Sequence, residues 1–347
     1  MIRKSPRSHA SYRLRRMLFF SLPLVPLASA CFAAIEAGGQ PEKTEIVVAY
    51  PQPSGASTPL WVAYEAGLFK KHGLGVKLEV LNPQAAVQAV VSGSADFAGV
   101  GVDLLNARLQ GAPLKVLMRT LERLVFQTWG GKGITSVQQL KGKTVAVSTP
   151  RSLIEIASRE GLKKSGLNPD RDVKFLPART VSGILTAVIA GQAAAGTLSA
   201  PTTLKARDAG LNLLIDIGRM NIPGLHAAYG SSEKYIKENP NTIYAFLKGL
   251  AEGVVLTRKE PESAKRAIAK YTKIDDPRMV NEAYEAFAPY WATGPAVNVA
   301  EIQSWFGYLD EKEFPQTKSA DPKEFYDNAF VYELERSGFF KRAGWAK

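Results

Sequence analysis

The sequence has little of what metal sites and disulfides are built from. It contains one cysteine, Cys31, and three histidines, His9, His72 and His226. A single thiol cannot close an intramolecular disulfide, and a zinc site needs several Cys or His ligands at characteristic spacings. No two histidines share helical spacing with a carboxylate. We therefore expect no metal site, and stability has to come from the size of the core.

The common catalytic signatures are also missing. There is no Gly-x-Ser-x-Gly elbow, and a Ser–His–Asp grouping would have only His226 available. The glycines at 99 and 101 lack the third glycine and the later acid of a dinucleotide fingerprint. No basic stripe is interleaved with aromatic residues, so a nucleic-acid partner is not expected. These absences predict a protein without a cofactor and without catalysis.

Acidic residues are absent from the first thirty positions, which carry six of the +12 formal charges. The basic stretch is followed by MLFFSLPLVPLASA and then by small residues, which predicts an export signal over 1–33. The apolar run is too short and too often broken by proline for a permanent span. Arg15-Arg16 fits the twin-arginine route and an ordinary secretory signal, and the sequence leaves both open.

Cys31 directly follows the small residues Ala28-Ser29-Ala30, where a lipid could be attached. Ala28 stands where a lipoprotein signal usually has leucine, so lipid anchoring is the less favoured outcome. Cleavage after residue 33 would leave a mature chain without cysteine. An exported chain without disulfides, behind a bacterial type of signal, indicates the periplasm.

Short β-rich runs alternate with helical patterns along most of the chain. Strands are expected at 45–50, 76–80, 97–100, 115–118, 125–129, 144–148, 173–176, 193–198 and 211–217. Helices are expected between them, including 59–72, 85–92, 103–110, 150–165, 182–190 and 201–209, and nearly everything after 231 is helical. This rhythm predicts an α/β fold with mainly parallel sheets flanked by helices.

The rhythm restarts near residue 125, which predicts two lobes with a crevice between them. We expect one lobe over 45–124 together with 224–347 and the other over 125–223. The chain would cross between them near Leu124 and Pro223.

Small hydroxyl residues recur where a predicted strand gives way to a helix. This occurs at Ser54–Thr58, at Thr149–Ser152 and at Ser199–Thr203. A fourth loop, 99–103, also follows a predicted strand and leads into a helix, with Asp103 as the expected cap. Each loop by itself can be an ordinary helix cap. The carboxyl ends of strands in open α/β sheets are also where ligands bind, and helix starts attract anions. Four such loops in two lobes favour a ligand clamped between them.

Several segments resemble the solute-binding proteins of ABC importers. They are PLWVAYEAGLFKKHGLGVKLE, DFAGVG, GKTVAVSTPRS, AGQAAAGTLSAPTTLKARDAG and AFLKGLAEGV. The chain is similar to the branch that binds nitrate, taurine, alkanesulfonates and pyrimidine precursors of thiamine, over about 45–308. The resemblance implies the type II periplasmic binding fold with a hinge of two crossing strands. It also implies a small-molecule ligand, a permease in the inner membrane and a monomer.

The family's binding loops map onto Ser54, Ser57, Thr58, Gly101, Val102, Thr149, Arg151, Ser152 and Ser199. Arg151 departs from the small polar residue expected there, and is either an anion partner or a solvated first-turn residue. Trp129 either stacks on the ligand or belongs to the lobe core.

The resemblance therefore implies capture of a small, anionic solute of the sulfonate, taurine or nitrate kind, without chemistry. Two alternatives stay open. One is a pyrimidine-binding protein or a related synthase-like enzyme; such synthases consume their own histidine, use iron and are cytoplasmic. The other is an exported sensor. Which ligand is bound stays open as well.

Overall fold

The computed structural model describes residues 39–51 and 54–345. All of them belong to one compact unit of the chain, Ile35–Lys347. The expected export signal over 1–33, with Cys31, lies outside the described residues. Among the described helices, none has both the length and the apolar character that a bilayer span requires.

The described strands form two five-stranded sheets, of which sheet A has the order β2-β1-β3-β10-β4. Its strands are β1 (Glu45–Tyr50), β2 (Gly75–Val80), β3 (Phe97–Ala98), β4 (Leu114–Arg123) and β10 (Pro223–Ser232). Strand β1 pairs in parallel with β2 and β3, whereas β10 is antiparallel to both β3 and β4. Four strands therefore point one way and β10 is reversed.

Sheet B has the order β7-β6-β8-β5-β9. Its strands are β5 (Gln127–Gly130), β6 (Lys143–Val147), β7 (Val173–Pro177), β8 (Ala195–Leu198) and β9 (Asn212–Asp216). Here β5 is the reversed strand. The chain passes from sheet A to sheet B between β4 and β5, and returns between β9 and β10. The predicted α/β fold with mainly parallel sheets is confirmed; the predicted lobe limits stay a prediction.

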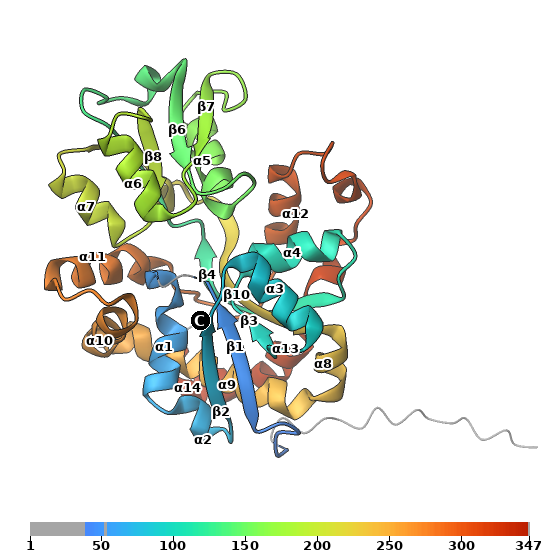
Figure 1. Ribbon diagram of the computed structural model, residues 1–347. Helices are drawn as coiled ribbons and strands as arrows, with labels where there is room; N and C mark the ends of the chain where they lie inside the picture. The colour runs from blue at the N-terminus through green and yellow to red at the C-terminus, as the bar shows by residue number, and fades with distance from the viewer. Residues whose placement is uncertain (1–38, 52–53, 346–347) are drawn as a thin grey trace, which may run out of the picture. The chain divides into compact units, whose positions relative to one another are not determined.

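The helices cover both faces of the sheets (Figure 1). The α-helices are α1 (Thr58–Glu65), α2 (Leu68–Lys71), α3 (Pro83–Ser92), α4 (Gly101–Leu109), α5 (Leu153–Lys164), α6 (Val181–Ile189), α7 (Thr202–Asp208), α8 (Glu233–Glu238), α9 (Pro240–Lys259), α10 (Pro261–Thr272), α11 (Pro277–Phe287), α12 (Val299–Tyr308), α13 (Ala329–Arg336) and α14 (Phe339–Ala343). Short 3-10 helices are η1 (Gly55–Ser57), η2 (Val137–Leu140), η3 (Ile217–Met220), η4 (Ala288–Tyr290), η5 (Pro315–Lys318) and η6 (Pro322–Phe325).

Strand β1 shows how sheet A is buried on both faces. Ile46, Val48 and Tyr50 belong to the hydrophobic cluster that also holds residues of α1, α9 and α10. Ala49 points into the cluster formed with α3, α4 and α12. Side chains of a strand alternate between its faces, so a continuous apolar run serves both clusters. Each large apolar side chain that is fully buried contributes roughly 1.5–3 kcal/mol, which makes this sheet a rigid base for the loops at its edge.

Sheet B is built in the same way on a smaller scale. Val145 of β6 packs in a cluster with Ala157 and Leu162 of α5. The next residue, Ala146, packs with Ile184 and other residues of α6. The sheet is thus held between α5 and α6, and the carboxyl ends of its parallel strands lie at one edge.

Two of the helix boundaries that differ from the sequence prediction are explained by a single backbone conformation. The helix expected over 59–72 is broken into α1 and α2, because Gly67 takes the left-handed conformation with φ of 67°. The helix expected from residue 150 begins only at Leu153, because Arg151 has a φ of 62° and Ser152 is the N-cap, accepting a hydrogen bond from the Glu155 amide.

Candidate functional site

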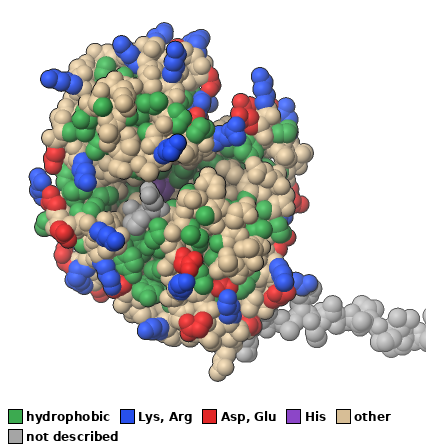
Figure 2. All heavy atoms as spheres, viewed as in Figure 1, with side chains coloured by type: hydrophobic (Ala, Val, Ile, Leu, Met, Phe, Trp, Pro, Cys, Tyr) green, Lys and Arg blue, Asp and Glu red, His purple; other side chains and the backbone are tan. Residues whose placement is uncertain are grey.

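The carboxyl ends of parallel strands from both sheets open onto one cavity of about 810 Å³. Figure 2 shows the hollow, with hydrophobic side chains along it and charged side chains on its rim. Sheet A and its helices contribute Ser54, Ala56, Ser57, Asn82, Gln84, Gln88, Val102, Asp103, Asn106 and Gln110, among others. Sheet B and its helices contribute Ser148, Thr149, Arg151, Ser152, Arg179, Thr180 and Ser199, among others. All four loops singled out in the sequence therefore reach one cavity.

The loop after β1 presents two serines to this cavity. Ser54 Oγ accepts a hydrogen bond from the Ala56 amide at 3.3 Å, which caps η1. Ser57 lines the cavity, and its hydroxyl makes no hydrogen bond to another described residue. Thr58 is fully buried and does not line the cavity; its hydroxyl donates to the Gly55 carbonyl at 2.7 Å. Thr58 thus stabilises the turn that holds the serines.

The loop after β3 differs from expectation, because α4 starts at Gly101 and its N-cap is Val100 instead of Asp103. A Cβ atom on Gly101 would lie 2.2 Å from the Leu225 carbonyl oxygen, so only glycine lets the helix start approach β10 this closely. Gly101 is buried behind the cavity wall, whereas Val102 forms part of it.

Asp103, in the first turn of α4, also lines the cavity. Its carboxylate makes no ion pair, and no hydrogen bond to another described residue. Burial raises the pKa of Asp103 to about 7, because a carboxylate withdrawn from water without a partner is disfavoured in its charged form. Asp103 was expected to cap the helix, and its place in the cavity lining was not predicted from the sequence.

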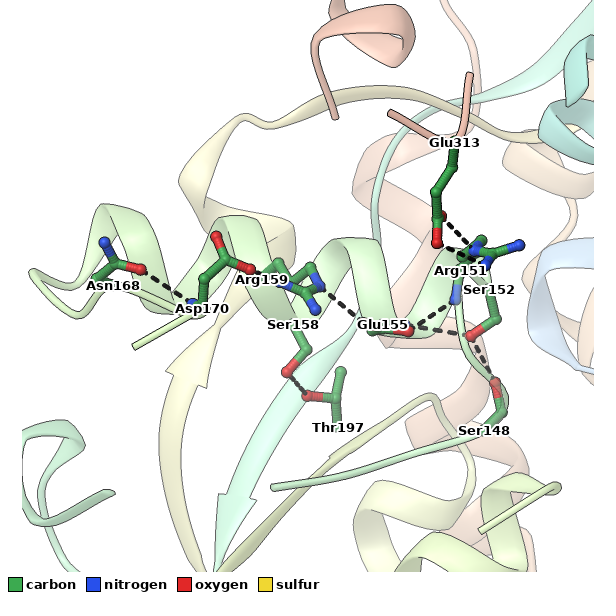
Figure 3. A network of polar contacts seen from close by, with 10 residues as sticks. All are labelled: Ser148, Arg151, Ser152, Glu155, Ser158, Arg159, Asn168, Asp170, Thr197 and Glu313. Carbon is green, nitrogen blue, oxygen red and sulfur yellow. Dashed lines mark hydrogen bonds and ion pairs between the residues drawn. The ribbon is translucent and has the colours of Figure 1, made fainter. Parts of the chain in front are cut away.

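The loop after β6 is held by a polar network, drawn in Figure 3. Ser148 Oγ donates to Ser152 Oγ at 2.9 Å, and Glu155 accepts from the Arg151 amide at 2.7 Å. The Arg151 side chain faces Glu313, with Nε at 2.5 Å from Oε2 and Nη2 at 2.6 Å from Oε1. Glu313 follows α12, which packs on β10 of sheet A. This ion pair therefore joins the two sides of the cavity and already neutralises Arg151.

Arg179, which the sequence analysis did not name, occupies the corresponding place after β7. Its backbone is left-handed, with φ of 68°, and its amide donates to the Ser148 carbonyl at 2.6 Å. Arg179 lines the cavity, and its guanidinium has no partner among the described residues. A sequence signal existed: Arg179 lies between a predicted strand and a predicted helix, as in the four loops that were recognised.

Phe126, on the segment between β4 and β5, and His226, near the start of β10, line the cavity. Their rings stack at a centroid distance of 4.6 Å and an angle of 9°. The Val125 amide donates to His226 Nδ1 at 3.1 Å, which leaves the proton of the neutral ring on Nε2. Burial lowers the pKa of His226 to about 3, so the ring is neutral around pH 7.

The structure brings seven of the ten predicted binding residues to the cavity. These are Ser54, Ser57, Val102, Thr149, Arg151, Ser152 and Ser199. Thr58, Gly101 and Trp129 do not line it. Trp129 packs in a cluster with Ile184 and Leu198, and its Nε1 donates to Gln127 Oε1 at 3.1 Å. That any of these residues binds a ligand stays a prediction.

Within residues 39–51 and 54–345, no group of three or more His, Cys, Asp or Glu residues is placed to hold a metal ion.

Comparison with known proteins gives a family and a fold. The family model described as NMT1/THI5 like matches residues 54–264. The riboflavin-binding protein RibY of Chloroflexus aurantiacus is 22% identical over 335 residues, covering 89% of this chain and 92% of RibY.

Two solved structures share the overall fold of this chain, although their sequence identity to it is low. The periplasmic aliphatic sulphonate binding protein SsuA from Escherichia coli has a TM-score of 0.67 and 18% identity, covering 82% of this chain and 92% of SsuA. The periplasmic nitrate-binding protein NrtA from Synechocystis PCC 6803 has a TM-score of 0.67 and 15% identity, covering 86% of this chain and 90% of NrtA. The protein thus has the periplasmic binding protein fold.

Proposed function

Because this chain belongs to the NMT1/THI5-like family, we propose that it is the substrate-binding component of an ABC importer. It captures a small solute between its two sheets and delivers it, chemically unchanged, to a permease in the inner membrane. It is exported to the periplasm by the segment 1–33.

One observation carries this proposal: loops from both sheets present unpartnered polar groups to the same cavity. Ser57 comes from sheet A, and Arg179 and Ser199 come from sheet B. None of these three side chains hydrogen-bonds to another described residue. Polar groups without protein partners lose free energy when water is excluded, unless a ligand pairs with them. A ligand that bridges the sheets supplies those partners.

The position of the cavity suggests how capture works. Phe126 lies on the segment between β4 and β5, and His226 lies in β10, close to the segment through which the chain returns from sheet B. Rotation about two such segments changes the distance between the sheets with little change inside either one. A ligand that contacts both sheets favours the closed arrangement, and a permease can recognise that arrangement by its different surface.

Hydroxyl groups and the Arg179 guanidinium suit an acidic group on the solute, such as a sulfonate or carboxylate. SsuA is described as a sulphonate binding protein and NrtA as a nitrate-binding protein, and both of these ligands are anions. RibY is described as a riboflavin-binding protein. The cavity of about 810 Å³ has room for an organic solute larger than nitrate.

A ligand screen tests the proposal. The protein is expressed with its natural N-terminus, recovered from the compartment to which it goes, and freed of bound solute by unfolding and refolding. Sulfonates, carboxylates, nitrate, pyrimidines and flavins are then compared by thermal shift, and hits are measured by calorimetry. A true ligand raises Tm progressively with its concentration, and mass spectrometry recovers it unchanged.

The proposal fails if no solute class raises Tm, or if the bound solute is converted to a product. It also fails in part if deleting the gene leaves uptake of the identified solute at its normal rate. A protein retained in the cytoplasm would refute the predicted export.

A further inference from the structure

Two charges of opposite sign are left without protein partners in the cavity, and they come from opposite sides. Asp103 lies on α4, which packs on β4 and β10 of sheet A. Arg179 follows β7 of sheet B. Neither side chain makes an ion pair with a described residue. The fold therefore leaves one anion and one cation facing the same cavity.

Other charged side chains near the cavity form ion pairs, which Asp103 and Arg179 do not. Arg151, at the same cavity, is paired with Glu313 at 2.5 Å. Arg108, one turn and a half further along α4 from Asp103, is paired with Glu233 at 2.5 Å. Glu155, behind the loop after β6, accepts from Arg159 at 2.7 Å. Asp103 and Arg179 are therefore the cavity-lining charged residues that make no ion pair with a described residue; Asp103 is half-buried, whereas Arg179 is exposed.

The residues around Asp103 indicate which kind of ligand group can pair with its carboxylate. Val102 and Leu104, its sequence neighbours, are buried, and α4 abuts β10 beside His226. The neutral His226 ring, the glutamine amides of α3 and the asparagine amide of α4 also line the cavity, and none of them carries a charge that could balance a carboxylate. A carboxylate in such a place is stabilised by a group that donates hydrogen bonds or carries a positive charge.

Resting on the proposed binding function, we propose that the ligand is amphoteric. Its acidic group faces Arg179 and the hydroxyls of Ser152 and Thr149, and a cationic or hydrogen-bond-donating nitrogen faces Asp103. A simple oxyanion satisfies only the sheet B side and leaves the Asp103 carboxylate unpaired. A site with a buried polar group discriminates strongly against ligands that fail to pair with it. Asp103 is thus the residue that selects amino-substituted acids over plain acids.

Matched ligand pairs test this selection directly. Alkanesulfonates and alkanoates of two to six carbons are compared with the same acids bearing a terminal amine, by calorimetry at pH 8 on solute-free protein. The amine is expected to tighten binding by about tenfold or more, the scale of a charge-assisted hydrogen bond. In Asp103→Asn this gain disappears, while binding of the plain acid is unchanged or tighter.

Two further variants separate this role from general damage. Arg179→Gln is expected to weaken the plain acid and its amino counterpart by a similar factor, because it removes the partner of the shared acidic group. Asp275→Asn makes the same carboxylate-to-amide change at an exposed position in the turn between α10 and α11, outside the cavity lining. It should leave both affinities unchanged. Circular dichroism confirms that each variant is folded.

The outcomes distinguish this proposal from the proposed function. Equal binding of plain and amino acids by the wild type, or an unchanged gain in Asp103→Asn, overturns the amphoteric ligand and leaves solute capture intact. The same holds if every amino acid probe fails while another solute class binds. If no solute of any class binds, both proposals fall.

Discussion

Replacing Asp103 by asparagine is expected to stabilise the ligand-free protein at pH 8 and to leave its stability nearly unchanged at pH 4. The carboxylate ionises in the unfolded chain near its ordinary pKa of 3.8, whereas burial raises the pKa of Asp103 to about 7 in the folded protein. A raised carboxyl pKa means that the folded state binds a proton more tightly. The contribution of the Asp103 carboxyl group to the stability of the folded protein is full below pH 3.8, and it is lost as the pH rises through about 7.

The size of the effect follows from the same two values. The difference between 3.8 and about 7 corresponds to an upper limit of ~4 kcal/mol. Asp103 is partly exposed to the cavity, so solvent reduces this figure, and we expect ~2 kcal/mol. Asparagine has nearly the same shape and stays neutral, so it avoids the penalty at high pH. For a chain of this size the gain in Tm is about 4 °C.

The assay is denaturant and thermal unfolding of both proteins at pH 4, 6 and 8 after removal of bound solute. His226 does not titrate in this window, because its pKa is lowered to about 3. The exposed Asp275→Asn serves as the matched control and should shift neither curve relative to the wild type. A stability difference that stays constant from pH 4 to 8, or a wild type that is the more stable protein at pH 8, would refute the reasoning.

Three further changes are expected to have distinct effects. Arg151→Ala removes a largely solvent-exposed ion pair, and such pairs contribute ~0–1 kcal/mol. We therefore expect the ligand Kd to change by less than about threefold. A loss of affinity above tenfold, measured by calorimetry, would make Arg151 a direct ligand contact. Gly101→Ala places a Cβ atom 2.2 Å from the Leu225 carbonyl oxygen. It should lower the free energy of unfolding in urea by ~2–4 kcal/mol. An unchanged midpoint would contradict the close packing of α4 on β10. His226→Phe removes the acceptor of the Val125 amide but keeps the ring stack on Phe126. We expect the free energy of unfolding to fall by ~1–3 kcal/mol. An unfolding curve that coincides with that of the wild type would disprove this expectation.

The sequence predicted the sheets and helices well because their signals are local. The run at Glu45–Tyr50 matches β1 to the residue, since a continuous apolar stretch is buried on both faces. The boundaries that were missed depend on single backbone conformations. Arg151 and Gly67 take positive φ values, and nothing in a pattern of apolar residues records them.

The convergence of four loops on one cavity could also be anticipated, because parallel strands place their carboxyl ends at one edge. Individual side chains were harder to assign. Trp129 was weighed as a ligand contact, yet its strand directs it into the cluster with Ile184. Asp103 was assigned to capping because the helix was expected to begin there, and aspartate is a favoured N-cap residue. The distinction rests on where α4 begins, which the close approach of Gly101 to β10 decides.

The two arginines of the cavity show why ligand chemistry cannot be predicted from composition in this fold. Arg151 and Arg179 both lie just before a helix of sheet B, and sequence alone gives them equal claims as anion partners. Their difference is set by Glu313, which is 162 residues away from Arg151 in the chain. The pairing neutralises Arg151 and leaves Arg179, like Asp103, without an ion pair among the described residues. Specificity in such a site is therefore determined by the charges that the fold leaves unpaired, and these emerge only when distant segments are brought together.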